Sequence, residues 1–248
     1  MQIRKFALLL LCLFFVKANA QNEKIFNKLN ELYTLDKYEE CIKRAENYIQ
    51  DKKDGKDAYP YLYASMSYFA IYQNPEQYDQ KKYKDPIRKA VSFAGKFYKH
   101  DKDGALRSES NDYMNHLRKA AIKECAYLLK NSDIRNLGNL SHEMAKDYPK
   151  DFPMQITAGT YLLYANMKAE GEKAIAGGLD SLKKAQPITD PLLQSDHAEA
   201  FLLYADYLAG NNEAKKANDV LKFALTVCPG NEQLQSASDK LGAEAPKK

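Results

Sequence analysis

Tryptophan is absent from this chain of 248 residues, and only four cysteines are present. One cysteine lies in the N-terminal apolar run, which leaves Cys41, Cys125 and Cys228, an odd number spread far apart. That spacing excludes the disulfide framework typical of small secreted domains. Cys41 falls where a seam between two helices needs a small apolar residue, so we interpret it as a buried hydrophobe rather than a reactive thiol.

Long apolar runs are also scarce. The run from Phe6 to Val16 follows two basic residues and precedes an Ala-Asn-Ala site at 18–20. This is the layout of a secretory signal peptide, with a retained N-terminal anchor as the alternative. No later segment approaches the roughly 18 to 20 apolar residues that a membrane helix needs. The sequence therefore predicts a signal peptide at 1–20 and an exported chain, periplasmic or extracellular, without a transmembrane segment.

The chain has no large excess of either charge. The predicted signal peptide holds three of the 37 basic residues and no acidic one, so 34 basic and 33 acidic residues remain. The basic isoelectric point of about 8.6 is then mostly due to the leader. Because nucleic-acid binding demands a concentrated basic face, we expect no nucleic-acid partner.

Alternation of apolar and polar residues with a period of two, the mark of strands, is nearly absent. Its one serious exception, 59–63, is followed by helical spacing, so Pro60 is predicted in the first turn of a helix. Elsewhere apolar residues recur every three or four positions, which indicates amphipathic helices separated by turn residues. The predicted helices are 22–34, 37–52, 58–73, 84–100, 106–130, 133–148, 152–168, 171–185, 191–210, 213–227 and 231–241.

These helices predict an all-α protein. They fall into about five antiparallel pairs, and neither helix of a pair can bury its apolar face alone. Stacking of successive pairs supplies the missing surface, which predicts an α-solenoid. We expect one repeat domain at 21–241 that ends in a capping helix at 231–241, followed by a disordered tail at 242–248.

Two stretches share one helix–turn–helix spacing. Near the end it comprises Phe201, Tyr204, Ala205, Leu208, Ala217, Leu221, Ala224 and Pro229, and near the start Leu29, Leu32, Tyr38, Cys41, Ala45 and Tyr48. This spacing resembles the tetratricopeptide repeat family, whose unit is a pair of helices. The middle departs from the family: polar residues are inserted at 74–83, and Gly171, Gly177 and Gly178 stand where helix formers are expected.

Catalytic and metal-binding patterns are missing. His142 and Glu143 begin like a zinc-protease helix, yet Lys146 stands where the second histidine is required. The other histidines are isolated, and neither a glycine-rich phosphate loop nor a nucleophile elbow is present. The sequence therefore predicts no enzyme, no cofactor and no metal site.

Tyrosine, in contrast, is abundant, with 18 residues. Many lie in the second helix pair and its insertion: Tyr59, Tyr61, Tyr63, Tyr68, Tyr72, Tyr78 and Tyr83. Tyrosine suits recognition surfaces, but bulky rings also fill helix seams, so both interpretations stay open. In arrays of this family the inner helices line a concave groove. By that resemblance the partner-binding candidates are Phe26, Asn30, Tyr33, Met66, Phe69, Leu202 and Asp206.

We expect a non-enzymatic protein–protein interaction scaffold of the bacterial cell envelope, presenting a concave helical surface to a partner protein or peptide. The alternative is a glycan-binding or hydrolytic protein on a helical scaffold. That alternative requires the rings of Tyr33, Tyr61 and Phe69 to be exposed on one wall, with carboxylates opposite. A third option is a purely structural spacer.

Overall fold

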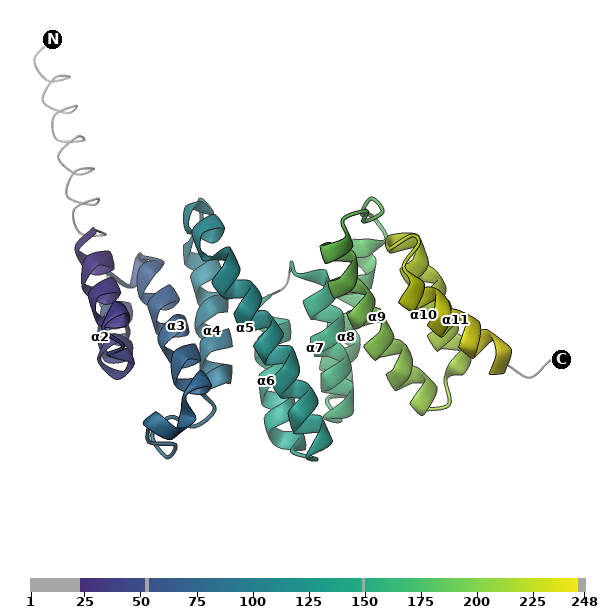
Figure 1. Cartoon of the computed structure of the whole chain (residues 1–248), viewed down its shortest axis with the longest axis horizontal. Helices are drawn as coiled ribbons and strands as arrows, with labels where there is room; N and C mark the ends of the chain where they lie inside the picture. Colours follow the sequence, from purple (N-terminus) through teal and green to yellow (C-terminus); the bar gives the residue numbers. More distant parts are fainter. Residues whose placement is uncertain (1–22, 52–53, 149, 245–248) are drawn as a thin grey trace, which may run out of the picture. The chain divides into compact units, whose positions relative to one another are not determined.

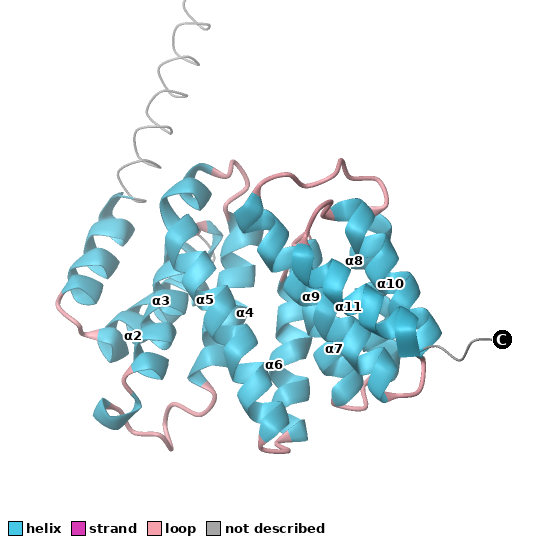
Figure 2. Cartoon of the chain, turned by 45° about the vertical axis from the view of Figure 1, so that its right-hand side comes forward, coloured by secondary structure: helices cyan, strands magenta, loops and turns pink. Residues whose placement is uncertain are grey.

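The computed structural model describes residues 23–51, 54–148 and 150–244, and every regular element in these ranges is a helix (Figures 1 and 2). This confirms the predicted all-helical class. The predicted signal peptide lies outside the described residues. The helices are residues 23–34, α2 (Tyr38–Gln50), η1 (Asp54–Lys56), α3 (Tyr59–Gln73), η2 (Pro75–Gln77), α4 (Pro86–His100), α5 (Ala105–Lys130), α6 (Ile134–Asp147), α7 (Phe152–Tyr164), α8 (Lys168–Leu182), α9 (Pro191–Gly210), α10 (Ala214–Val227) and α11 (Glu232–Glu244).

Turn residues set these bounds much as predicted. Pro60 lies in the first turn of α3, where its missing N–H costs no hydrogen bond. The side chain of Asp151 caps α7 by accepting a hydrogen bond from the backbone N–H of Met154 at 2.9 Å. Local side-chain chemistry therefore explains where these helices begin.

Several predicted helix boundaries are wrong. The helix predicted at 152–168 ends four residues earlier, because α7 ends at Tyr164. The helix predicted at 171–185 begins three residues earlier, because α8 begins at Lys168. Asn166 breaks the helix by adopting a left-handed φ of 60°. The capping helix predicted at 231–241 is also too short, since α11 continues to Glu244; residues 245–248 of the predicted tail lie outside the described part.

Contacts divide the chain into two compact units, up to Ala120 (unit 1) and from Ala121 onward (unit 2), with the boundary inside α5. In unit 1, α2 and α4 both pack against α3. In unit 2, α7 packs against α6, α8 and α9, while α11 covers α9 and α10. Each unit is thus built from helices that pack on the next helix in the chain, and in unit 2 also on the next but one.

One turn geometry recurs at four helix–helix connections. The N–H of the residue after each left-handed position donates to the carbonyl of a leucine five residues earlier, at 2.9 Å in all four turns. This is the Schellman ending of a helix, which requires one residue with positive φ. The left-handed residues are Asp36, Ser132, Asn166 and Asn212, with φ from 56° to 63°, and the leucines are Leu32, Leu128, Leu162 and Leu208.

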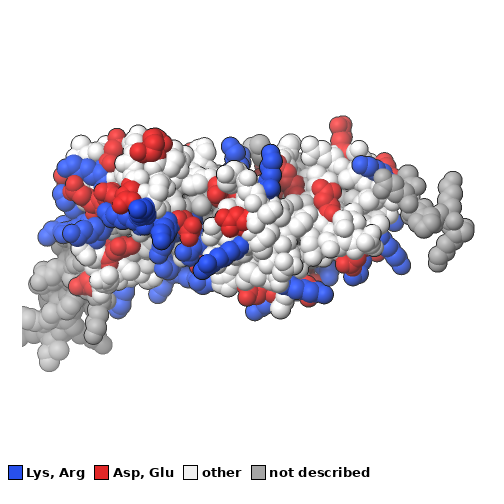
Figure 3. Space-filling view, turned by 90° about the horizontal axis from the view of Figure 1, so that it is seen from below, with Lys and Arg blue, Asp and Glu red and all other residues white. Residues whose placement is uncertain are grey.

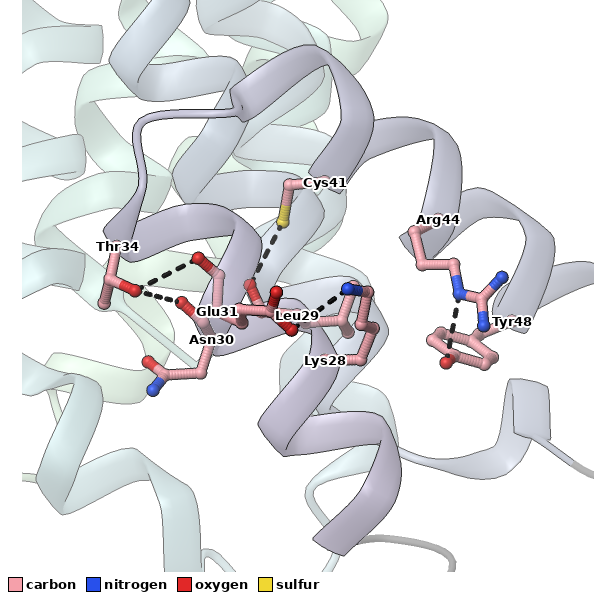
Figure 4. A network of polar contacts seen from close by, with 8 residues as sticks. All are labelled: Lys28, Leu29, Asn30, Glu31, Thr34, Cys41, Arg44 and Tyr48. Carbon is pink, nitrogen blue, oxygen red and sulfur yellow. Dashed lines mark hydrogen bonds and ion pairs between the residues drawn. The ribbon is translucent and has the colours of Figure 1, made fainter.

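The connection between α3 and α4 lacks this turn. In the first helix pair, Cys41 Sγ donates to the carbonyl of Leu29 at 3.6 Å, across 12 residues of sequence (Figure 4). Between α3 and α4 a seam bond runs in the opposite direction, from Ser65 Oγ on the first helix to the carbonyl of Ala90 on the second, at 2.7 Å and across 25 residues. Both helix pairs therefore have a hydrogen bond across the contact between their two helices, but the bonded residues of the second pair are 13 positions further apart in the sequence. The additional residues lie between α3 and α4.

Close approach of α7 and α8 explains two of the three unexpected glycines. A Cβ atom at Gly171 would lie 2.7 Å from the carbonyl oxygen of Gly159, and one at Gly178 would lie 3.0 Å from Ile156 Cγ1. A Cβ atom at Gly177 would meet nothing within 4 Å. The crossing therefore needs Gly171 and Gly178 to be small, whereas Gly177 faces open space.

Candidate functional site

A continuous row of aromatic rings crosses unit 1. In order along the row, the residues are Tyr59, Phe26, Tyr63, Tyr33 and Tyr38, with centroid distances of 5.0, 6.2, 5.9 and 5.3 Å. We call these five residues the aromatic row. Helical spacing produces it, because residues three, four or seven positions apart lie on one face of a helix. Tyr59, Phe26, Tyr33 and Tyr38 are half-buried and Tyr63 is buried, so part of the row remains accessible.

Three predicted site residues, Phe26, Asn30 and Tyr33, come together here. The hydroxyl group of Tyr63 donates to Oδ1 of Asn30 at 3.0 Å, which joins α3 to the first helix. Among the described residues no other hydrogen bond uses the Asn30 amide, so its N–H groups are the donors left for a partner. The hydroxyl of Thr34 donates to the backbone carbonyl of Asn30 at 2.8 Å (Figure 4), which does not involve the side-chain amide.

The two predicted site residues on α3 differ in exposure. Met66 is half-buried, but the side chain of Phe69 is only 7 % exposed. Its ring lies 5.9 Å from that of Tyr113 on α5. Tyr61 is also 7 % exposed and stacks on His100 at 4.2 Å. Since the rings of Phe69 and Tyr61 are covered, neither forms the exposed wall that the glycan-binding alternative requires.

The remaining two predicted site residues belong to unit 2. Leu202 on α9 packs against the core of that unit. Asp206, one turn further along, is exposed. Burial, and then the charge of Asp206, raise the pKa of Tyr164 above its ordinary value. The predicted set therefore divides into five residues of unit 1 and two of unit 2.

The row also includes residues that the sequence did not single out as a site. In the sequence, Tyr59 and Tyr63 belong to a tyrosine-rich stretch and Tyr38 is a repeat position. The spacing of four residues between Tyr59 and Tyr63 places both on one face of α3. That spacing was the available signal, but the sequence does not show which helix this face meets.

Burial raises the pKa of tyrosines in the row, whose ordinary pKa near 10 already keeps the phenols protonated at neutral pH. It is the largest cause of the raised pKa values of Tyr33 and Tyr63. For Tyr38 the largest cause is the hydrogen bond to Asp36, where the hydroxyl donates to Oδ1 at 2.5 Å. The row therefore carries hydroxyl donors and no charge of its own.

The thiols are buried, which confirms the interpretation of Cys41. Burial raises the pKa of Cys41 to about 11 and that of Cys125 to about 12. A raised folded pKa gives stability that is complete below the unfolded pKa of about 8.5 and is lost as pH rises through the folded pKa. Both thiols therefore oppose unfolding at neutral pH, and this contribution declines above about pH 9.

We accordingly expect unfolding to become easier in alkali. Between pH 9 and 11 the free energy of unfolding of Cys125→Ala should fall less steeply than that of the unchanged protein. The difference should be about 1.4 kcal/mol per pH unit, the value for one proton. Urea titrations at several pH values measure both slopes, and parallel slopes would contradict the assignment. At pH 7 the two slopes should coincide.

His142 has a partner other than a metal. Its Nδ1 lies 2.7 Å from Oε2 of Glu170 on α8, and the neighbouring Glu143 pairs with Lys146 at 3.5 Å. Within the described ranges, no three His, Cys, Asp or Glu side chains are close enough to hold a metal ion. His142 and Glu143 are therefore each partnered by another side chain.

The surface and helix lengths bear on the expected partners. Basic and acidic side chains are interspersed on the face of the molecule that Figure 3 shows. Among residues 23–51, 54–148 and 150–244, no helix has the length and apolar content required to cross a membrane.

Comparison with known proteins found no matching family model, no matching curated protein and no matching solved structure.

Proposed function

We propose that this protein is a tetratricopeptide-like α-solenoid of about five helix pairs that serves as an interaction scaffold for a protein or peptide. The observation that carries the proposal is the recurring turn. Its left-handed residues Ser132 and Asn166 are 34 positions apart, the period of this repeat family, and the next, Asn212, follows 46 positions after Asn166. The same turn ends the first helix of four pairs, and the fifth pair keeps the seam contact from Ser65 to Ala90.

The aromatic row and Asn30 are the part of the protein best suited to a partner. Half-buried rings offer large apolar area at low entropic cost, because a tyrosine has few rotatable bonds. The Asn30 amide adds N–H donors, with its oxygen held by the Tyr63 hydroxyl. This combination fits an extended peptide that places an apolar side chain on the rings and a backbone carbonyl on the amide.

The cellular setting follows from the predicted signal peptide. An exported helical-repeat protein without a disulfide framework fits the bacterial cell envelope. There a rigid, preorganised surface would bind a partner protein without catalysing a reaction.

Selection from a displayed library of random peptides tests this proposal. The bait is the chain without residues 1–20, and the affinity of each selected peptide is measured by calorimetry. We expect Asn30→Ala to weaken binding roughly tenfold, the effect of a moderate hot spot. Tyr63→Phe should also weaken it, because the amide loses its fixed orientation.

Tyr127→Ala is the matched control, because Tyr127 is exposed and lies in unit 2. Its affinity should equal that of the unchanged protein. Failure to select any peptide, or equal affinity of all variants, would overturn the proposed site. Binding to immobilised glycans that depends on Phe26 and Tyr59 would support the glycan-binding alternative instead.

A further inference from the structure

The insertion between α3 and α4, Asn74–Asp85, is folded upon itself. The side-chain amide of Gln80 donates to the carbonyl of Tyr78 at 3.2 Å and also to that of Pro75. The carbonyl of Asp79 accepts the backbone N–H of Tyr83 at 2.9 Å. Its own bonds therefore give this connection a defined shape, as a compact loop has.

The insertion contacts helices on two sides. Tyr83 is only 6 % exposed and its ring lies 6.2 Å from that of Tyr68, which anchors the insertion on α3. Tyr78 reaches α2, with its ring 6.4 Å from that of Tyr38. Lys82 Nζ also reaches α2 and lies 3.1 Å from Oε1 of Glu39. The insertion thus connects the first helix pair to the second.

The contact with α2 leads directly to the candidate site. Tyr38, which Tyr78 touches, lies 5.3 Å from Tyr33, and Tyr33 lies 5.9 Å from Tyr63. The hydroxyl of Tyr38 is fixed by Asp36 at 2.5 Å, inside the turn of the first pair. The ring of Tyr38 is therefore held by the turn, and Tyr78 packs on it from the insertion.

We propose that the insertion is a clasp, in which Tyr78 and Lys82 hold the first helix pair on α3 and so position Tyr33 in the candidate site. Tyr78 and Lys82 are positioning residues, since they act through Tyr38 and Glu39. The importance of Tyr33 for binding rests on the proposed function, whereas the clasp itself is a property of the fold. Insertion residues that contact neither α2 nor α3 should not affect the position of the first helix pair.

Two measurements without any ligand test the clasp. Because the chain contains no tryptophan, Tyr33→Trp gives a single reporter whose quenching by acrylamide measures access to position 33. Hydrogen exchange of residues 23–50, in the chain with Tyr33 unchanged, reports local opening of the first pair. We expect Tyr78→Ala to increase both quenching and exchange, the exchange by roughly three- to tenfold, as the loss of one or two aromatic pairs implies.

Gln77→Ala is the matched control, because Gln77 is exposed and its one described hydrogen bond uses its backbone N–H. It should leave quenching and exchange unchanged. Lys82→Glu should speed exchange less than Tyr78→Ala, since exposed ion pairs contribute little. The double variant Lys82→Glu with Glu39→Lys should restore part of the slow exchange, because the ion pair re-forms while the contact of Lys82 Nζ with the ring of Tyr83 at 4.9 Å stays lost. General damage to the loop would show no such rescue.

Unchanged exchange of residues 23–50 in Tyr78→Ala would overturn the clasp. Equal acceleration in α9 and α10 would overturn it as well, because the effect would then be global unfolding. Both measurements stand without a ligand, so failure to select a peptide would count against the proposed function alone. Where a peptide is found, the clasp predicts weaker binding to Tyr78→Ala and equal binding to Gln77→Ala.

Discussion

Replacing Gly171 by alanine is expected to lower the free energy of unfolding of unit 2 by about 2 kcal/mol, even though alanine favours helices. The added Cβ atom would lie 2.7 Å from the carbonyl oxygen of Gly159 and 2.9 Å from Leu163 Cδ2. The first of these is a backbone atom in the middle of α7, which cannot move without displacing the helix. The clash therefore outweighs the gain of about 1 kcal/mol in helix propensity.

Gly177→Ala is the matched control for this prediction, six residues away on the same helix. A Cβ atom there meets nothing within 4 Å, so only the propensity gain remains and stability should rise by about 1 kcal/mol. Urea titrations followed by circular dichroism measure both variants, and hydrogen exchange in α8 assigns the change to unit 2. Equal stability of the two variants would show that the crossing of α7 and α8 is looser than the structure has it.

The same glycines show what the sequence can and cannot predict. Periodicity and turn residues predicted the helices well, because both act within a few residues of the chain. From the sequence alone, a glycine inside a helix is expected to lower helix stability, and nothing in the packing around Gly177 offsets that cost. The reason for Gly171 lies in Gly159 on α7, a packing partner that no local pattern identifies.

Exposure in the candidate site was unpredictable for a related reason. Phe69 satisfies the helical spacing of a groove residue, yet Tyr113 covers its ring from α5. Spacing shows which residues share a face, but not whether a later helix packs on that face. Tyr33 was predicted and lies in the aromatic row, and Asn30 was predicted and bonds to Tyr63 of the row. Their link through Tyr63 depends on the packing of α3 on the first helix, which spacing does not predict.

Replacing Arg107 by alanine is expected to destabilise unit 1 by about 2 kcal/mol, because the buried carboxylate of Asp101 loses a half-exposed cation and two carbonyls lose a charged donor. The side chain of Asp101, at the end of α4, is only 5 % exposed, and its Oδ2 lies 3.3 Å from Nε of Arg107. Nη2 of Arg107 also donates to the carbonyls of Tyr98 at 2.9 Å and Asp101 at 2.8 Å. The guanidinium thereby satisfies the Tyr98 carbonyl in the last turn of α4 and gives the Asp101 carbonyl a second donor beside the N–H of Gly104 at 3.3 Å.

A variant series separates the charge of Arg107 from its shape. Arg107→Lys keeps the charge but should recover only part of the stability, since one ammonium group cannot reproduce the fork that spans two carbonyls and a carboxylate. Asp101→Asn removes the buried charge, so combining it with Arg107→Ala should cost less than the sum of the two single changes. Urea titrations of the four proteins in this cycle measure the coupling. Strict additivity of the two changes in the free energy of unfolding would contradict the ion pair. Lys28→Ala is the control, since Lys28 belongs to an exposed ion pair elsewhere in unit 1, and it should change stability by less than about 1 kcal/mol.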